Sequence, residues 1–237
     1  MALSDLNAYE EGGVDGLFLE NNYGLSGEKI SATQAVAMGY LVDKIRSATT
    51  LPLGVSVLWN DYETAFALAK TYDLDFIRVP VFVDEVEAYC GRIVGNSDHV
   101  KKVQAELEAH DIAVFTDILV KHSKHISPHS LEESAEKAIS SGSDALIVTG
   151  DWTGEPPNEH TIANLKNSVG NFPIFVGSGA NTKNVDGLLR HADGVIVSTS
   201  LKEGETDPRE RNVKSFTQRV SRSKVKAFMK AINEKHE

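Results

Sequence analysis

Short apolar runs alternate with helix-like segments along almost the whole sequence, and this alternation limits the possible folds more than any other feature. The runs are apolar almost throughout, as in parallel strands that are covered on both faces. The segments between them place apolar residues at helical spacing, and several begin with a residue that caps helices. One of them, Ser130 followed by Glu133, has the spacing of a capping box. We expect strands over 16–20, 53–59, 75–81, 112–118, 145–150, 173–177 and 194–199.

The expected helices cover 2–13, 31–48, 61–72, 97–110, 130–142, 158–169 and 182–192, with a last helix within 212–235. The seven strand–helix units favour an α/β fold, either a TIM-type (β/α)8 barrel or a doubly wound sheet. The barrel is preferred because small-residue turns follow the last two strands, where barrel enzymes often hold a phosphate. The count is one strand short, so we expect a barrel that lacks its usual first strand. No linker divides the chain, and residues 1–237 are expected to form one domain.

Composition narrows the functional classes. The formal charge of −10 argues against nonspecific binding to nucleic acid or to an anionic membrane, while other peripheral membrane association stays open. No stretch approaches the roughly 20 apolar residues that span a bilayer. Cys90 is the only cysteine, which predicts a reducing compartment, and we expect the protein to be cytoplasmic. Neither a dinucleotide-binding glycine motif nor a Walker loop is present, so no cofactor is predicted.

Small and hydroxyl-bearing residues end two consecutive strands. Gly177, Ser178 and Gly179 follow one strand, and Ser198, Thr199 and Ser200 end the next. Backbone N–H groups and hydroxyls at such positions can surround a phosphate from two sides. Ordinary tight turns explain the same residues. We take these six residues as the candidate binding site for a phosphate or another anion.

Polar and ionisable residues also lie at the ends of the expected strands, where barrel active sites are built. The candidates for acid–base or carbonyl chemistry are Glu20, Asp61, Asp117 and Lys121, and the further candidates for substrate binding are Asn21 and Arg78. A lysine with a lowered pKa could form an imine with a carbonyl substrate. Structural alternatives exist for each. Asp61 could cap a helix, Arg78 could neutralise a buried carboxylate, and Asp117 could pair with Lys121.

Three histidines, His122, His125 and His129, fall in the segment KHSKHISPH. Imidazoles bind zinc and other transition metals, which makes a metal site conceivable. The segment also contains serine and proline and has no helical register. We therefore favour an exposed flexible loop and predict no metal site.

The sequence resembles the BtpA/SgcQ family of predicted TIM barrels, named for a photosystem I biogenesis protein and a sugar-operon protein. The segments that carry the resemblance are GGVDGLFLEN (12–21), PLGVSVLWND (52–61), FIRVPVF (76–82), TDILVKHS (116–123), ALIVTGDWTG (145–154), VGSGANTKNV (176–185) and DGVIVSTSLK (193–202). Members of this family usually have an additional strand and a loop with His and Pro before the GGVDG segment. This sequence lacks that part, so residues of the first strand are not carried over.

Two functions are compatible with these observations. The first is an enzyme, a lyase or an isomerase, that acts on a small phosphorylated metabolite resembling a sugar phosphate. The second, which the resemblance implies, is a non-catalytic scaffold or assembly factor such as a photosystem biogenesis factor. Exposed strand edges of an incomplete barrel would favour a partner or a homo-oligomer.

Overall fold

A computed structural model describes residues 2–21, 27–204 and 218–233. Seven strands form the main sheet and confirm the predicted α/β fold. In hydrogen-bonded order they are β1 (Leu17–Glu20), β2 (Leu53–Ser56), β3 (Phe76–Val79), β6 (Ala113–Leu119), β8 (Ala145–Val148), β9 (Ile174–Val176) and β10 (Gly194–Val195). Neighbours pair in parallel, as in β1 with β2 and β9 with β10. The observed strands are mostly shorter than expected, and the expected run 194–199 ends in a turn of 3-10 helix, η1 (Thr199–Leu201).

The helices lie where the apolar spacing predicted them. They are α1 (Ala2–Glu10), α2 (Ala32–Arg46), α3 (Tyr62–Thr71), α4 (Ser97–Glu106), α5 (Leu131–Ser140), α6 (Glu159–Val169), α7 (Val185–Leu189) and α8 (Arg222–Asn233). The predicted capping box at Ser130 and Glu133 is present, and Ser31 forms a second one with Gln34. Each box satisfies two backbone N–H groups that the first helical turn leaves unpaired.

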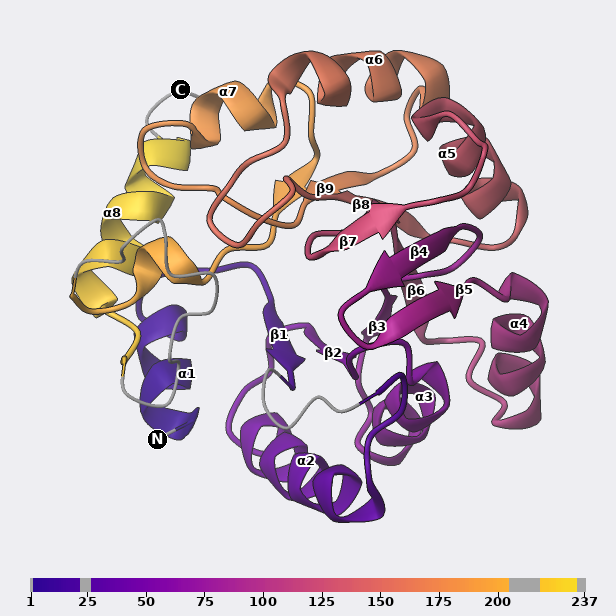
Figure 1. Cartoon of the computed structure of the whole chain (residues 1–237). Helices are drawn as coiled ribbons and strands as arrows, with labels where there is room; N and C mark the ends of the chain where they lie inside the picture. The colour runs from indigo at the N-terminus through magenta and orange to yellow at the C-terminus, as the bar shows by residue number, and fades with distance from the viewer. Residues whose placement is uncertain (1, 22–26, 205–217, 234–237) are drawn as a thin grey trace. The chain divides into compact units, whose positions relative to one another are not determined.

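The chain contains two compact units. One comprises residues 15–146, and the other comprises residues 1–14 together with 147–237. The first unit holds β1, β2, β3 and β6 with α2 to α5, drawn from indigo to magenta in Figure 1. The second holds α1, β9, β10 and α6 to α8, with α1 packed against α8. Strand β8 runs through the boundary between residues 146 and 147.

An aspartate directly before a strand aligns that strand with its neighbour. In three places the carboxylate accepts a hydrogen bond from the N–H of a residue at the start of the adjacent strand, at 2.7 or 2.8 Å. The backbone N–H of the aspartate donates to the carbonyl of that same residue. These pairings fix the register at the amino ends of the strands. The pairs are Asp75 with Leu53, Asp144 with Val114 and Asp193 with Ile174.

A second sheet was not predicted. Strands β4 (Glu85–Ala88) and β5 (Gly91–Val94) form an antiparallel hairpin, and β7 (Ser123–His125) pairs antiparallel with β4. The prediction of an exposed flexible loop over the three histidines was therefore wrong at β7. Val86 pairs with His125 across the two strands, so the chain there is held by main-chain hydrogen bonds.

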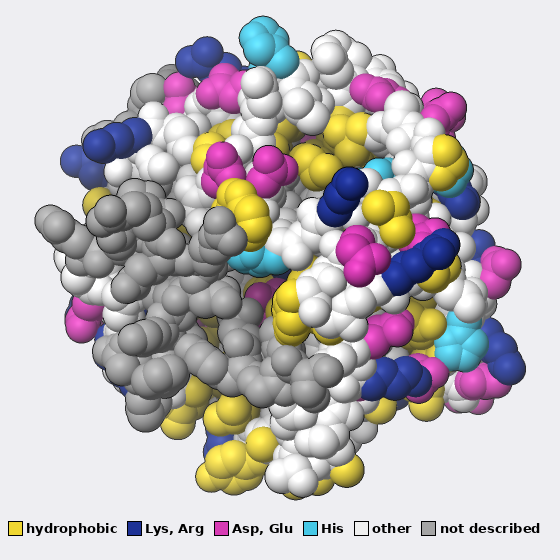
Figure 2. Space-filling view, in the orientation of Figure 1, with side chains coloured by type: hydrophobic (Ala, Val, Ile, Leu, Met, Phe, Trp, Pro, Cys, Tyr) yellow, Lys and Arg dark blue, Asp and Glu magenta, His cyan; other side chains and the backbone are white. Residues whose placement is uncertain are grey.

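The surface in view carries charges of both signs. Figure 2 shows Lys and Arg side chains interspersed with Asp and Glu over the face that grey atoms leave visible. No broad basic area appears on that face. Among the described helices, none is both long and apolar enough to cross a membrane.

Candidate active site

One face of the sheet in the unit of residues 15–146 is lined by two rows of side chains. Because side chains alternate along a strand, residues in register point to the same face. The first row contains Phe18, Gly54 and Phe76, and the second contains Glu20, Ser56 and Arg78. From β6, Phe115 joins these rows, and its ring stacks on Phe76 with 4.6 Å between centroids. An aromatic layer thus lies beside a charged one.

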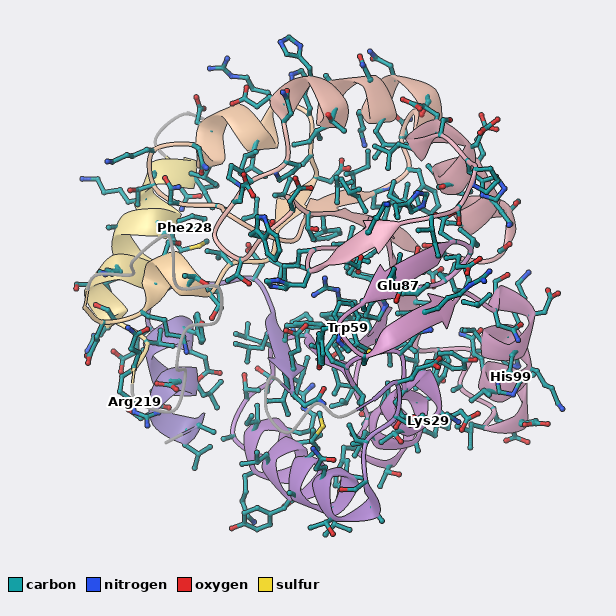
Figure 3. The ribbon with its side chains drawn as sticks, in the orientation of Figure 1. Lys29, Trp59, Glu87, His99, Arg219 and Phe228 are labelled. Atoms are coloured by element: carbon teal, nitrogen blue, oxygen red, sulfur yellow. The ribbon has the colours of Figure 1, made fainter. Side chains whose placement is uncertain are left out.

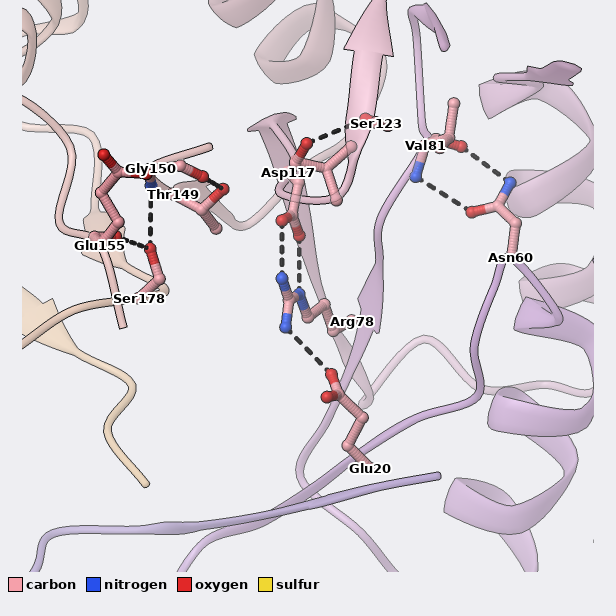
Figure 4. A network of polar contacts seen from close by, with 11 residues as sticks. Glu20, Asn60, Arg78, Val81, Asp117, Ser123, Thr149, Gly150, Glu155 and Ser178 are labelled. Carbon is pink, nitrogen blue, oxygen red and sulfur yellow. Dashed lines mark hydrogen bonds and ion pairs between the residues drawn. The ribbon is translucent and has the colours of Figure 1, made fainter. Parts of the chain in front are cut away.

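Arg78 is the centre of the charged row (Figure 4). Its Nε and Nη2 donate to the two carboxylate oxygens of Asp117, each at 2.7 Å. Its Nη1 donates to Oε2 of Glu20 at 3.1 Å, across β2. The Asp117 side chain is fully enclosed, whereas that of Glu20 is 16% exposed. Both oxygens of Asp117 therefore bond to Arg78, while Glu20 forms one longer hydrogen bond with Arg78 and is partly exposed to solvent.

Burial would lower the pKa of Arg78, but the carboxylates of Asp117 and Glu20 outweigh it, and the pKa is raised above its ordinary value. Burial also raises the pKa of Asp117, with Arg78 opposing this effect. A two-bond pairing between guanidinium and carboxylate is the strongest kind of ion pair in proteins. We therefore expect both groups to be charged at neutral pH. This pairing is the structural alternative considered for Arg78 from the sequence.

Lys121 lies close to the same charges. Burial lowers the pKa of its ammonium, Glu20 and Asp117 raise it, and Arg78 lowers it further, with a net decrease. Within the described residues, its Nζ has no hydrogen-bond partner, and no ion pair to Asp117 forms. The structure thus brings together four of the predicted residues: Glu20, Arg78, Asp117 and Lys121.

A small apolar cluster covers this end of the sheet. It consists of Trp59, Val81, Val86, Ala88 and Ile93, with Cys90 and Val120 packed against it. Trp59, labelled in Figure 3, follows β2, and Val86, Ala88 and Ile93 come from the β4–β5 hairpin. Because Val120 lies directly before Lys121, the unpredicted hairpin sheet adds apolar surroundings to the chain that carries this lysine.

Asn21, Asn60 and Asp61 are used in holding the loops. The Asn21 amide bonds to both the N–H and the carbonyl of Leu58, at 2.6 and 3.2 Å. The Asn60 amide does the same with Val81 (Figure 4). Asp61 caps α3 and also accepts from the N–H of Ile30. Asn21 and Asn60 extend the pairing between strands beyond the strand ends. The catalytic role of Asp61 and the substrate-binding role of Asn21 stay predictions.

The predicted anion-binding residues lie in two loops of the other unit. The Ser178 hydroxyl is committed internally: it accepts from the N–H of Gly150 at 2.8 Å and donates to the carbonyl of Glu155 at 2.6 Å (Figure 4). The Ser200 hydroxyl donates to the carbonyl of Ala180. The N–H of Gly177 donates to the carbonyl of Val148. These groups hold the loops in place.

The backbone N–H groups of the same loops are largely free. In the part of the chain that the structure describes, no acceptor is bonded to the N–H of Ser178, Gly179, Ser198, Thr199 or Ser200. Gly179 has a φ of +72°, a conformation that favours glycine. An added Cβ there would lie 2.1 Å from the Pro156 nitrogen, so glycine is also required by space. The sequence predicted the loops, but not that the Ser178 and Ser200 hydroxyls bond within the protein while these N–H groups have no bonded acceptor among the described residues.

Two of the three predicted histidines face a buried carboxylate that sequence reasoning missed. Nδ1 of His129 lies 3.2 Å from one oxygen of Asp84, and Nε2 of His125 lies 3.3 Å from the other. The Asp84 side chain is 7% exposed. No group of three or more metal-binding side chains was found in the described ranges. We therefore interpret the two contacts as fastening the turn after β7 to the chain before β4.

A family model and curated relatives identify the lineage of the sequence. The model of the BtpA family matches residues 1–234. The chain belongs to the BtpA family. It is similar to the photosystem I biogenesis protein BtpA of Synechocystis, with 33% identity over 98% of this chain and 79% of that protein. A protein of Archaeoglobus fulgidus is 34% identical over 86% of this chain and 81% of its own length.

Solved structures confirm the TIM-barrel type of fold. Thiamine phosphate pyrophosphorylase from Pyrococcus furiosus matches with a TM-score of 0.63 and 13% identity, covering 98% of this chain and 89% of that chain. Phosphoribosyl anthranilate isomerase from Thermus thermophilus matches with a TM-score of 0.62 and 13% identity, covering 98% and 94%. At such low identity these matches show the fold of this BtpA family member and not its reaction.

Proposed function

We propose that this BtpA family protein is an enzyme that binds a small phosphorylated metabolite through the loops after β9 and β10. The observation that carries the proposal is the set of backbone N–H groups at Ser178, Gly179, Ser198, Thr199 and Ser200 that have no bonded acceptor among the described residues. Backbone N–H groups at the ends of parallel strands are suited to phosphate oxygens. Two structurally similar proteins, thiamine phosphate pyrophosphorylase and phosphoribosyl anthranilate isomerase, are named for phosphate-containing compounds, which agrees with this class of ligand.

Within the unit of residues 15–146, taken by itself, the groups that we propose to react are those of the charged row. Glu20 is a partly exposed carboxylate, Lys121 is an amine without a hydrogen bond among the described residues, and Asp117 holds Arg78 in position. A carboxylate and an amine with a lowered pKa can exchange protons at neutral pH, which suits a lyase or an isomerase. We do not extend the proposal to Asp61, because its carboxylate is used at the start of α3.

A titration with phosphate compounds tests the binding part. Glycerol 3-phosphate and inorganic phosphate are expected to raise the melting temperature saturably, and glycerol is not. A ligand present at a hundred times its Kd stabilises a protein by about 2.7 kcal/mol. Ser198→Asp places a negative charge on an exposed position of the loop and is expected to abolish the shift. Thr33→Asp, on the exposed start of α2, is the matched control and should leave the shift unchanged.

A melting temperature that no phosphate compound changes would contradict the proposal. So would a shift that Ser198→Asp and Thr33→Asp leave equally intact, because the anion would then bind elsewhere.

The second candidate function is assembly of a protein complex. It is favoured by one observation, the likeness to a protein named for photosystem I biogenesis. A stable protein partner that copurifies with the chain, together with no response to phosphate compounds, would favour this function over the enzyme.

A further inference from the structure

The end of β6 places one amine in an unusual setting. Lys121 is the second residue after β6, and the next residue, His122, has a φ of +62°. A residue other than glycine in this left-handed conformation costs free energy and occurs where the surroundings enforce it. Here the turn is closed by Ser123, whose hydroxyl donates to the carbonyl of Val120 at 2.9 Å. The backbone that carries Lys121 is therefore fixed on both sides.

The charges around this amine are already partnered. Arg78 bonds both oxygens of Asp117 and one oxygen of Glu20, so neither carboxylate depends on Lys121 for a hydrogen bond. The Lys121 Nζ makes none in the described residues, although its side chain is partly exposed. Burial lowers its pKa, which increases the fraction of neutral amine near pH 7. A partly exposed amine without a hydrogen bond becomes a nucleophile once it has lost its proton.

We propose that Lys121 forms an imine with the carbonyl carbon of an aldehyde or ketone substrate, with Glu20 as the proton carrier. The proposal rests on the proposed function only in using the same charged row. Glu20 is suited to its role because one carboxylate oxygen bonds Arg78, while the side chain still reaches solvent. Asp117 is a positioning residue that acts through Arg78, because both its oxygens are occupied and enclosed.

The step balances without a further reactant. Glu20 takes one proton from the Lys121 ammonium, and the free Nζ electron pair attacks the carbonyl carbon. A proton moves from Nζ to the former carbonyl oxygen, which gives a carbinolamine. Glu20 then returns its proton to that oxygen, which leaves as water while the C–N double bond forms. The substrate is thus held as a protonated imine, an electron-withdrawing group that favours proton loss or bond cleavage at the neighbouring carbon.

Reductive trapping tests the proposal on the whole 237-residue chain. The protein is incubated with pyruvate, glycolaldehyde or dihydroxyacetone phosphate, reduced with borohydride, and mapped by mass spectrometry of its peptides. The expected result at pH 7 is an adduct on Lys121 with at least one carbonyl, in large excess over the exposed Lys124 of β7. Lys121→Arg should remove the adduct, and Lys124→Arg, the matched control, should leave it unchanged.

A second variant separates a reacting lysine from one that is only accessible. Glu20→Gln should slow adduct formation at Lys121 by about 100-fold, the usual scale of proton-transfer catalysis, without moving the adduct to another lysine. Circular dichroism of each variant checks that it is folded. If Lys121→Arg does not fold, the adduct map of the unmodified protein still decides.

Three results would overturn the proposal: no adduct at Lys121 with any of the three carbonyls, equal labelling of Lys121 and Lys124, or an adduct rate that Glu20→Gln does not change. Pyruvate and glycolaldehyde carry no phosphate, so their trapping is independent of the loops after β9 and β10. Failure of the imine with an intact response to phosphate therefore refutes this inference alone, and the reverse result refutes only the phosphate site.

Discussion

The charged row and the loops after β9 and β10 use their polar groups in opposite ways. In the charged row the backbone is paired in the sheet, and the side chains of Glu20 and Lys121 can still form further hydrogen bonds. In the loops the hydroxyls of Ser178 and Ser200 form hydrogen bonds with backbone groups of the protein, and the loop N–H groups have no bonded acceptor among the described residues. The charged row is therefore suited to a reaction that needs particular side chains. The second is suited to binding that depends on backbone shape.

The largest expected effect is the loss of Arg78. Arg78→Met leaves the carboxylate of Asp117 buried without a partner, and breaking such a pair costs about 3–5 kcal/mol. Urea denaturation measures this loss in the free energy of unfolding. The double variant Arg78→Met with Asp117→Leu removes both charges and should recover a large part of it. A loss below about 1 kcal/mol in the single variant would show that the ion pair does not hold the row.

Backbone shape in the loops is tested by two glycines with similar φ. Gly179→Ala is expected to cost about 2–4 kcal/mol, because a left-handed φ is combined with a Cβ placed 2.1 Å from Pro156. Gly154→Ala, with a φ of +85° and no atom within 4 Å of its Cβ, should cost only about 1–2 kcal/mol. Equal losses in urea denaturation would mean that φ alone, and not the close approach, requires Gly179.

The smallest effect concerns the pH dependence of stability at Lys121. The pKa of this lysine is lowered in the folded protein, so the unfolded chain binds more protons between the folded pKa and the ordinary value of 10.5. The free energy of unfolding of the natural protein, relative to Lys121→Met, should therefore rise with pH through this window and level off above it.

Denaturation curves of both proteins at several pH values measure this difference. A difference that falls as the pH rises would show that the lysine is stabilised in its charged form, and would argue for an electrostatic role instead of an imine.

The two regions also differ in how far the sequence revealed them. Glu20, Arg78, Asp117 and Lys121 were predicted together with Asn21 and Asp61, because their polar side chains lie in or shortly after apolar runs that could be recognised as strands. The free N–H groups could not be predicted, since every residue except proline has one and only the fold decides which are paired. The internal use of the Ser178 hydroxyl depends on Gly150, which lies 28 residues away.

The hairpin sheet left a weak pattern that was overlooked. In β4 the apolar residues Val86 and Ala88 alternate with glutamates, and Gly91 with a φ of +108° follows the turn. That alternation over four residues, before a glycine, is typical of a half-buried hairpin. The pairing of Asp84 with His125 and His129 had no comparable pattern, because it joins segments more than 40 residues apart.

The aspartates that precede β3, β8 and β10 each align the strand that follows with the strand before it in the sheet. Asp75, Asp144 and Asp193 lie directly before β3, β8 and β10, and they bind the starts of β2, β6 and β9 respectively. A shift of one residue would turn the side chains of a strand to the opposite face. Each of these three aspartates thus fixes the register of its strand against the preceding strand of the sheet. Exchange of a whole strand–helix segment between relatives would then conserve which side chains of its strand point to each face of the sheet, provided that the aspartate moves with it.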